Sequence, residues 1–203
     1  MIKMKTSIYY KALALCLLLL FAQGAAAVVF EVTTAEEFQA ALTAAASNGG
    51  DDEIQLSAGV YRGNFKYFSE QNSSLTISSA AGPQLTTIDA AQSTYGLYLN
   101  YGGYNGTLTL KGFSIKNARN TATGAGLILL GLRGELSLDS MEISNNTAAS
   151  ASALWVSGGN TSTRISDSKF ANNEANEGTV IFLEDCDGLY FSESQITGTR
   201  GSG

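Results

Sequence analysis

The chain has 203 residues, among them 22 glycines, a single proline and no histidine. Twelve Lys and Arg stand against 18 Asp and Glu, a formal net charge of −6, which disfavours nucleic acid and anionic membranes as partners because phosphate binding depends on clustered basic side chains. Without histidine, a Cys–His nucleophile is also excluded.

Residues 1–27 have the pattern of an export signal. Three lysines precede an apolar run over residues 12–21, and Ala25–Ala27 forms a small-residue cleavage site. An uncleaved membrane anchor is the alternative, but the run is shorter than the ~20 residues that a membrane-spanning helix needs. We expect cleavage before Val28, a secreted, periplasmic or cell-surface protein, and no membrane insertion of the processed chain.

A capping helix is expected over about residues 34–48. Thr34 and Glu37 have the spacing of a capping box. Apolar residues follow at helical spacing on one face, namely Phe38, Ala41, Leu42 and Ala45. Gly49 and Gly50 are expected to end the helix. From about Ile54, alternation of apolar and polar residues predicts the first strand of a domain that covers residues 28–203.

The rest of the chain repeats. Three segments align without gaps: 108–117, 136–145 and 163–172, and a fourth, 189–198, keeps their apolar pattern. One column of this alignment holds Ile115, Ile143, Phe170 and Ile196, with steps of 28, 27 and 26 residues. A second set of strands precedes these segments, at 96–99, 126–129, 153–156 and 179–182. Such a period, with short strands and no helix-length segment, predicts an all-β parallel solenoid rather than helical repeats or a propeller.

The opening of the domain, Val32–Leu42 followed by Asp52–Gly63, resembles the cap and first strand of the right-handed parallel β-helix superfamily, also called pectin lyase-like. The resemblance extends over Val28–Gly203 and implies a right-handed coil whose N-terminal end is sealed by the helix, in an exported bacterial protein. It says little about function, since such scaffolds serve lyases, hydrolases, adhesins and inert stalks.

Residues 198–203 stop within a coil, without a capping element. Because solenoids need capped ends, we expect either that the sequence is truncated at this end or that later coils or another chain cover it.

Asn117, Asn145 and Asn172 occupy the same position after a strand. Turn asparagines tolerate left-handed backbone geometry, and amides stacked from coil to coil can bond one another. We favour this structural ladder over a polar binding site.

Strand alternation predicts an outward column of Tyr98, Ile128, Trp155 and Ile181, and it also turns Tyr190 outward on a neighbouring strand. Aromatic rings along a flat sheet suit stacking against sugars, so Tyr98, Trp155 and Tyr190 are candidate carbohydrate-binding residues. Packing of a loop, such as Tyr101–Tyr104, or of a partner subunit against this face is the alternative.

Polysaccharide lyases of the superfamily use a Lys or Arg base with clustered carboxylates. The outer-face bases here are Lys111, Arg133, Arg164 and Lys169, with Asp139, Glu142 and Asp167 nearby. They do not form such a cluster, and Glu142 with Lys169 suggests a salt bridge, so no catalytic residue is predicted. The acidic group 184–188 suits Ca²⁺ by its oxygen donors but lacks Ca²⁺-loop spacing, so we favour a solvated turn and predict no metal site and no cofactor.

These observations favour a non-catalytic secreted or cell-surface scaffold, adhesin-like or in contact with glycans, whose partner is a polysaccharide or a cell-surface glycan. The alternatives are the N-terminal portion of a polysaccharide lyase acting on uronate polymers by β-elimination, and a purely structural stalk.

Overall fold

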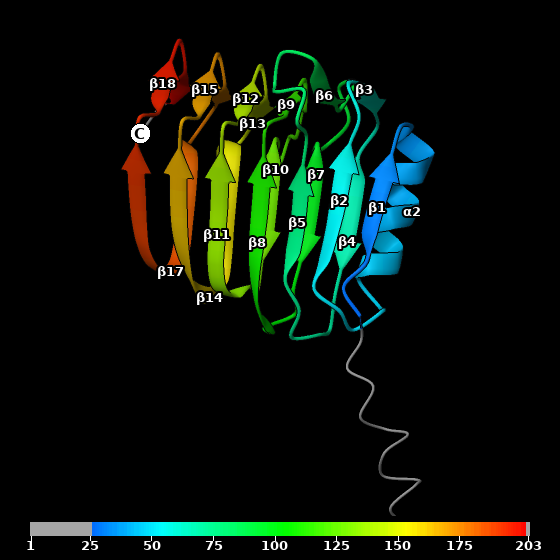
Figure 1. Ribbon diagram of the computed structural model, residues 1–203. Helices are drawn as coiled ribbons and strands as arrows, with labels where there is room; N and C mark the ends of the chain where they lie inside the picture. The colour runs from blue at the N-terminus through cyan, green and yellow to red at the C-terminus, as the bar shows by residue number, and fades with distance from the viewer. Residues whose placement is uncertain (1–25, 202–203) are drawn as a thin grey trace, which may run out of the picture.

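The computed structural model describes residues 26–201, which form a parallel β-solenoid of about six turns with 55% strand and 6% helix (Figure 1). Each turn rises along the front of the solenoid, crosses its top and descends along its back, while successive turns advance away from the helix (Figure 1). This path is right-handed, so the predicted fold class is confirmed. Most of the predicted export signal, residues 1–25, lies outside the described residues.

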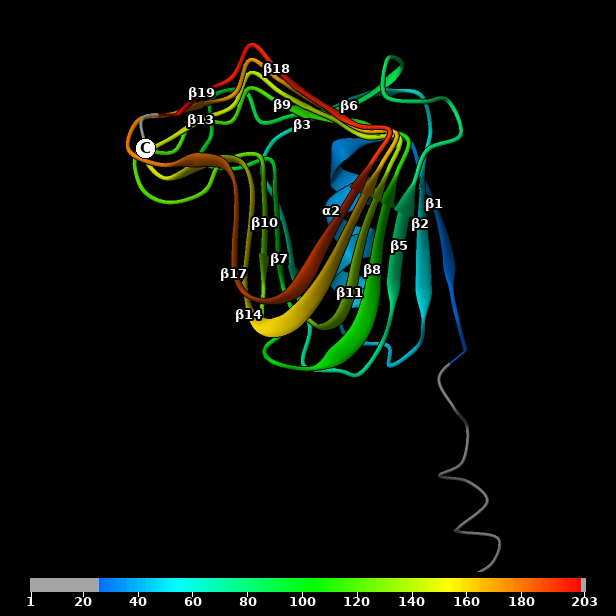
Figure 2. The ribbon, with the colours of Figure 1, turned by 90° about the vertical axis from the view of Figure 1, so that its left-hand side faces the viewer.

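The largest sheet has ten strands and bends around one corner of the solenoid. Its front limb contains β1 (Val29–Val32), β2 (Asp52–Leu56), β5 (Leu75–Ser78), β8 (Asn105–Lys111) and β11 (Arg133–Asp139). Its back limb contains β4 (Phe65–Phe68), β7 (Leu97–Asn100) and β10 (Leu127–Leu130). Two long strands, β14 (Ala151–Ser166) and β17 (Thr179–Ser192), round the corner and contribute to both limbs (Figure 2).

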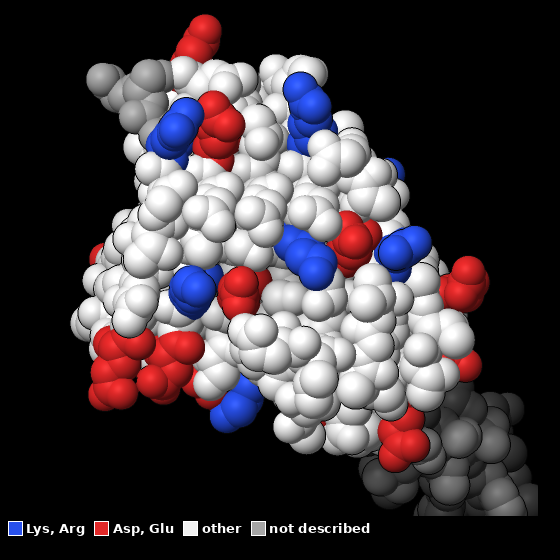
Figure 3. Space-filling view, turned by 90° about the horizontal axis from the view of Figure 1, so that it is seen from above, with Lys and Arg blue, Asp and Glu red and all other residues white. Residues whose placement is uncertain are grey.

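Two smaller sheets close the coil. The first contains β3 (Gly59–Arg62), β6 (Thr86–Asp89), β9 (Ser114–Lys116), β12 (Glu142–Ser144), β15 (Lys169–Ala171) and β18 (Gln195–Thr197). The second contains β13 (Thr147–Ala148), β16 (Glu174–Ala175) and β19 (Arg200–Gly201). Seen from above, basic and acidic side chains are interspersed among neutral ones (Figure 3). In register, for example, Asp89 stands between Arg62 and Lys116.

The helix α2 (Ala35–Ala45) covers the N-terminal end of the coil (Figure 1). Its capping box is formed as predicted: the Thr34 side chain accepts from the backbone of Glu37, and the Glu37 carboxylate accepts from the backbone of Thr34. The four residues predicted for its apolar face are the buried ones. The helix ends earlier than predicted, with Ala46 as C-cap instead of the glycine pair. Strand β1 precedes the helix and adds a parallel strand to β2.

The interior consists of apolar columns that run from coil to coil. Ile115, Ile143, Phe170 and Ile196 are in register as predicted. The first three are fully buried, whereas Ile196 in the last described coil is 48% exposed. This column is covered only where a further coil stacks against it.

One register was predicted incorrectly. Leu154 pairs with Ile181, and Trp155 pairs with Phe182, because an irregularity in the β14–β17 ladder follows the Ala151–Thr179 pair. A one-residue slip exchanges the two faces of a strand. Ile181 therefore packs against the core, and Phe182 takes the outward position predicted for Ile181.

Candidate functional site

The outward column of the back limb is continuous over five strands. In register it contains Lys66, Tyr98, Ile128, Trp155 and Phe182. Neighbouring strands in a sheet lie about 4.7–4.9 Å apart, so these side chains project at regular intervals along the solenoid axis. The two candidate residues Tyr98 and Trp155 thus share one face, with Ile128 between them.

Around Tyr98 the face is enlarged by two further aromatic rings. The ring centroid of Tyr98 lies 5.5 Å from that of Phe68 and 5.5 Å from that of Tyr95. The ammonium of Lys66 lies 5.8 Å from the Tyr95 centroid, within the range of a cation–π contact. Phe68 is 57% exposed, so this end of the column offers an open aromatic surface next to one positive charge.

The loop between β9 and β10 covers the middle of the column. Ile128 is only 6% exposed, and a Cβ added to Gly124 would lie 3.0 Å from both the Ile128 and the Trp155 side chains. Hydrogen bonds from Ala122 N–H to the Asn120 side chain (2.9 Å) and from Ala151 N–H to the Thr123 carbonyl (2.8 Å) hold the loop in place. A residue without a side chain at position 124 lets the loop lie directly on the column.

Beyond this loop, Trp155 and Phe182 line a small cavity. Their ring centroids are 5.9 Å apart and their planes are inclined by 82°. The cavity measures about 230 Å³, and its lining is completed by Thr123, Ser150, Ala151 and Glu184. The Glu184 carboxylate accepts a 2.6 Å hydrogen bond from the Ser157 hydroxyl. The site therefore joins two aromatic walls, two hydroxyl groups and a carboxylate that is held in position.

Tyr190 does not join the other two candidates. It lies on the front limb of β17, in register with Arg164, whose guanidinium is 5.1 Å from the Tyr190 ring centroid. Its side chain is 58% exposed. β17 bends around the corner of the solenoid (Figure 2), so Tyr190 on its front limb is separated from Phe182, which is in register with Trp155 on the back limb.

The predicted asparagine row forms the turn, while the coil-to-coil amide bonds lie one residue later. Asn117, Asn145 and Asn172 all have left-handed backbone, with φ of 61°, 55° and 52°. The amide–amide bond between these coils runs instead from Asn146 to Asn173, at 3.0 Å, and both residues are fully buried. The repeated Asn–Asn pairs at 145–146 and 172–173 are the sequence pattern from which the second, buried asparagine ladder could have been predicted.

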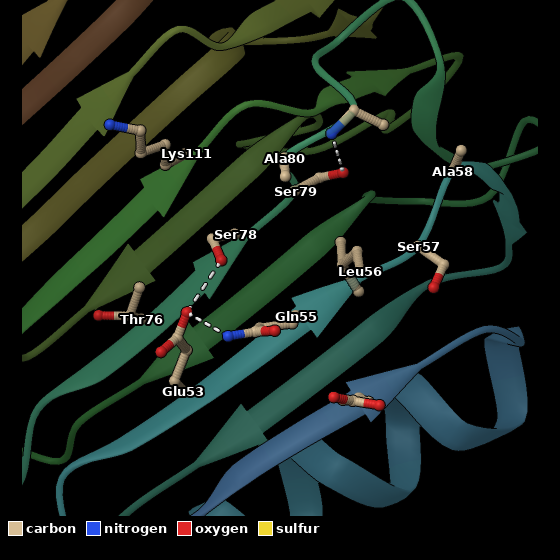
Figure 4. Close-up of a pocket in the computed structure, with 12 residues that line it drawn as sticks. Glu53, Gln55, Leu56, Ser57, Ala58, Thr76, Ser78, Ser79, Ala80 and Lys111 are labelled. Atoms are coloured by element: carbon tan, nitrogen blue, oxygen red, sulfur yellow. Dashed lines mark hydrogen bonds between the residues drawn. The ribbon is translucent and has the colours of Figure 1, made fainter.

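The front limb bears a second, more polar cleft of about 720 Å³, which the sequence did not reveal (Figure 4). The outward side chains of β2, β5 and β8 form its floor, and the segment after β5 forms part of its wall. Within the cleft, Glu53 accepts from Gln55 at 3.0 Å and from Ser78 at 3.2 Å (Figure 4).

Lys111 borders this cleft but is not a free base. It forms a 2.7 Å ion pair with Asp139, and this contact raises the pKa of Lys111 and lowers that of Asp139. A lysine that abstracts protons needs the opposite shift. Glu142 and Lys169 are in register as predicted, but Glu142 accepts from Gln84 at 2.9 Å, and the structure shows no ion pair with Lys169 among residues 26–201.

The acidic segment 184–188 lies at the corner of β17. Asp185 has left-handed backbone with φ of 51°, and Glu184 points to the aromatic cavity. Partial burial raises the pKa of the Cys186 thiol.

Over residues 26–201 the structure contains no group of three or more potential metal-ligating side chains. In the same range, no helix is long and apolar enough to cross a bilayer.

Comparison with protein-family models, curated proteins and solved structures returned no match. What the structure establishes is therefore the fold itself, a parallel β-solenoid scaffold.

Proposed function

We propose that the chain is an exported bacterial β-helix scaffold of the pectin lyase-like kind that contacts glycans through its back limb, without catalysing a reaction. The observation that carries this proposal is the pair of Trp155 and Phe182, whose rings form perpendicular walls of a cavity about 230 Å³ in volume. Aromatic faces provide rigid apolar area, and the Thr123 and Ser150 hydroxyls beside them suit the hydroxyl groups of a sugar ring.

The open aromatic surface at Tyr98 extends the same face. Tyr98 and Trp155 are two coils apart in register, so an extended polysaccharide lying along the solenoid axis meets first one group of rings and then the other. Between them, the β9–β10 loop lies over Ile128 of β10. Tyr190 belongs to a separate face and is outside the proposed site.

The test is a glycan array followed by titration calorimetry on the glycans that bind. Trp155→Ala is expected to weaken binding about tenfold or more, corresponding to about 1.4 kcal/mol. Tyr98→Ala is expected to weaken binding to long chains but not to single sugars. Tyr190→Ala is the matched control and should leave affinity unchanged. Absence of binding by the unaltered protein across the array would refute the glycan contact.

The lyase alternative is tested separately. Elimination from a uronate polymer creates an unsaturated sugar that absorbs in the ultraviolet. We expect no such product from alginate, pectate or chondroitin, since the structure pairs Lys111 with Asp139 instead of leaving it as a base. Formation of the product would overturn the non-catalytic part of the proposal.

A further inference from the structure

A buried carboxylate stands at the point where the exported chain is expected to begin. Asp52 on β2 is only 4% exposed. Its Oδ1 accepts from the Val28 backbone N–H at 2.9 Å and from the Asn48 side chain at 2.9 Å. Its Oδ2 is buried and has no hydrogen-bond partner among residues 26–201. No Lys or Arg of that range forms an ion pair with it either.

Such a group is costly to maintain. Burying a charged oxygen without a partner destabilises the fold, and buried carboxylates are ordinarily paired. In the uncleaved chain Val28 contributes one peptide N–H, which Oδ1 already uses. As long as Val28 is joined to Ala27, Oδ2 of Asp52 therefore has no hydrogen-bond donor among the described residues.

We infer that Asp52 is the binding site for the α-ammonium group of Val28 that export cleavage after Ala27 creates. This inference rests on the export part of the proposed function. Hydrolysis of the Ala27–Val28 peptide bond consumes one water, leaves a carboxylate on Ala27 and gives Val28 an amine that takes up a proton. The nitrogen now at 2.9 Å from Oδ1 then carries a positive charge and additional donors, which can reach Oδ2.

The surrounding backbone holds the nitrogen in place. Val28 O accepts from Glu53 N–H at 2.9 Å, so the first residue of the processed chain is already part of the β1–β2 ladder. Asn48 is itself fixed, because its Oδ1 accepts from Gly50 N–H at 3.0 Å. A Cβ on Gly50 would lie 2.6 Å from the Ala26 carbonyl, so the residues that cleavage removes pass directly over this position.

The inference is tested by a double-mutant cycle on chains with defined N-termini. One chain begins at Val28 and the other at Ala27, which moves the ammonium one residue away and restores the peptide N–H at Val28. Each is made with Asp52 and with Asp52→Asn. The chain that begins at Val28 is expected to melt about 2–4 °C higher than the chain that begins at Ala27, and this difference should disappear with Asp52→Asn. Equal differences in both backgrounds would overturn the inference.

A second measurement does not depend on the folding of Asp52→Asn. Acylation of the α-amine at neutral pH, followed by mass spectrometry, should be several-fold slower for the chain that begins at Val28 than for the chain that begins at Ala27. Equal rates would contradict the ion pair. The N-terminal residue of protein recovered after export tests the proposed function instead: a start other than Val28 refutes that cleavage site, whatever the cycle shows.

Discussion

The two ends of the solenoid use the same inward positions with opposite results. At the N-terminal end, Tyr61 occupies the same column as Ile196 and is only 1% exposed. The fully buried Phe38 of α2 packs there, with its ring centroid 5.9 Å from that of Tyr61 and 4.7 Å from that of Phe65. In the last described coil, Phe191 is 41% exposed and Ile196 is 48% exposed. The difference shows that an inward-facing column is only half of a core: each coil also needs a neighbour on either side.

The largest expected effect breaks the covered end. Phe38→Ala should lower the free energy of unfolding by about 3–5 kcal/mol, because it removes a ring from a filled interior. Phe191→Ala, the same substitution at the open end, should cost about 1 kcal/mol or less. Urea denaturation monitored by circular dichroism measures both. Equal losses would mean that the C-terminal coil is covered in solution.

An intermediate effect is expected where the coils rely on amides rather than aromatic rings. Asn146 accepts from Ala118 N–H at 2.9 Å and donates to Asn173 at 3.0 Å. Asn146→Ala leaves buried partners unsatisfied and should cost about 1–3 kcal/mol.

The neighbouring Asn145 supplies the control for this change. Its side chain is exposed and its backbone is left-handed, so Asn145→Gly should remain within about 0.5 kcal/mol of the unaltered protein. Urea denaturation compares the two variants. If Asn145→Gly lost as much free energy of unfolding as Asn146→Ala, the exposed turn asparagines, and not the buried ones alone, would stabilise the stacking of the coils.

The smallest expected effect concerns the cap itself. Thr34→Ala should lower the free energy of unfolding by about 1 kcal/mol, since it removes the hydroxyl that accepts from Glu37 N–H.

Hydrogen bonds from the Thr33 backbone, from the Thr33 hydroxyl and from the Thr34 backbone lower the pKa of Glu37. A lowered pKa in the folded state means that this stabilisation is present above the ordinary Glu range and is lost as the pH falls through the lowered value. The melting temperature of Glu37→Gln should therefore depend less on pH in that acidic range than that of the unaltered protein.

The sequence predicted the scaffold because its signals are local and repeated. The capping box needs only Thr34 and Glu37, and the column from Ile115 to Ile196 appears in the spacing alone. The period of two along a strand then assigns inward and outward faces, provided that the register is known.

Where the register shifted, the prediction failed. The sequence of residues 152–153 and 179–182 contains no sign of the irregularity in the β14–β17 ladder. For this reason Phe182 was expected in the core and Ile181 outside it. In the same way, the turn asparagines were recognisable by their position, but which amide of each Asn–Asn pair is buried depends on the path of the neighbouring coil.

The candidate sites depended still more on tertiary structure. Sequence alone determined a parallel coil, its helical cap and an outward column containing Tyr98 and Trp155. Only the fold decided that Tyr190 lies on another limb, that Gly124 allows a loop to cover Ile128, and that Asp52 is buried beside the nitrogen of Val28. The reason is physical: hydrophobic period and capping are properties of a chain segment, whereas burial, cavities and unsatisfied partners are created by residues distant in the sequence that come together on folding.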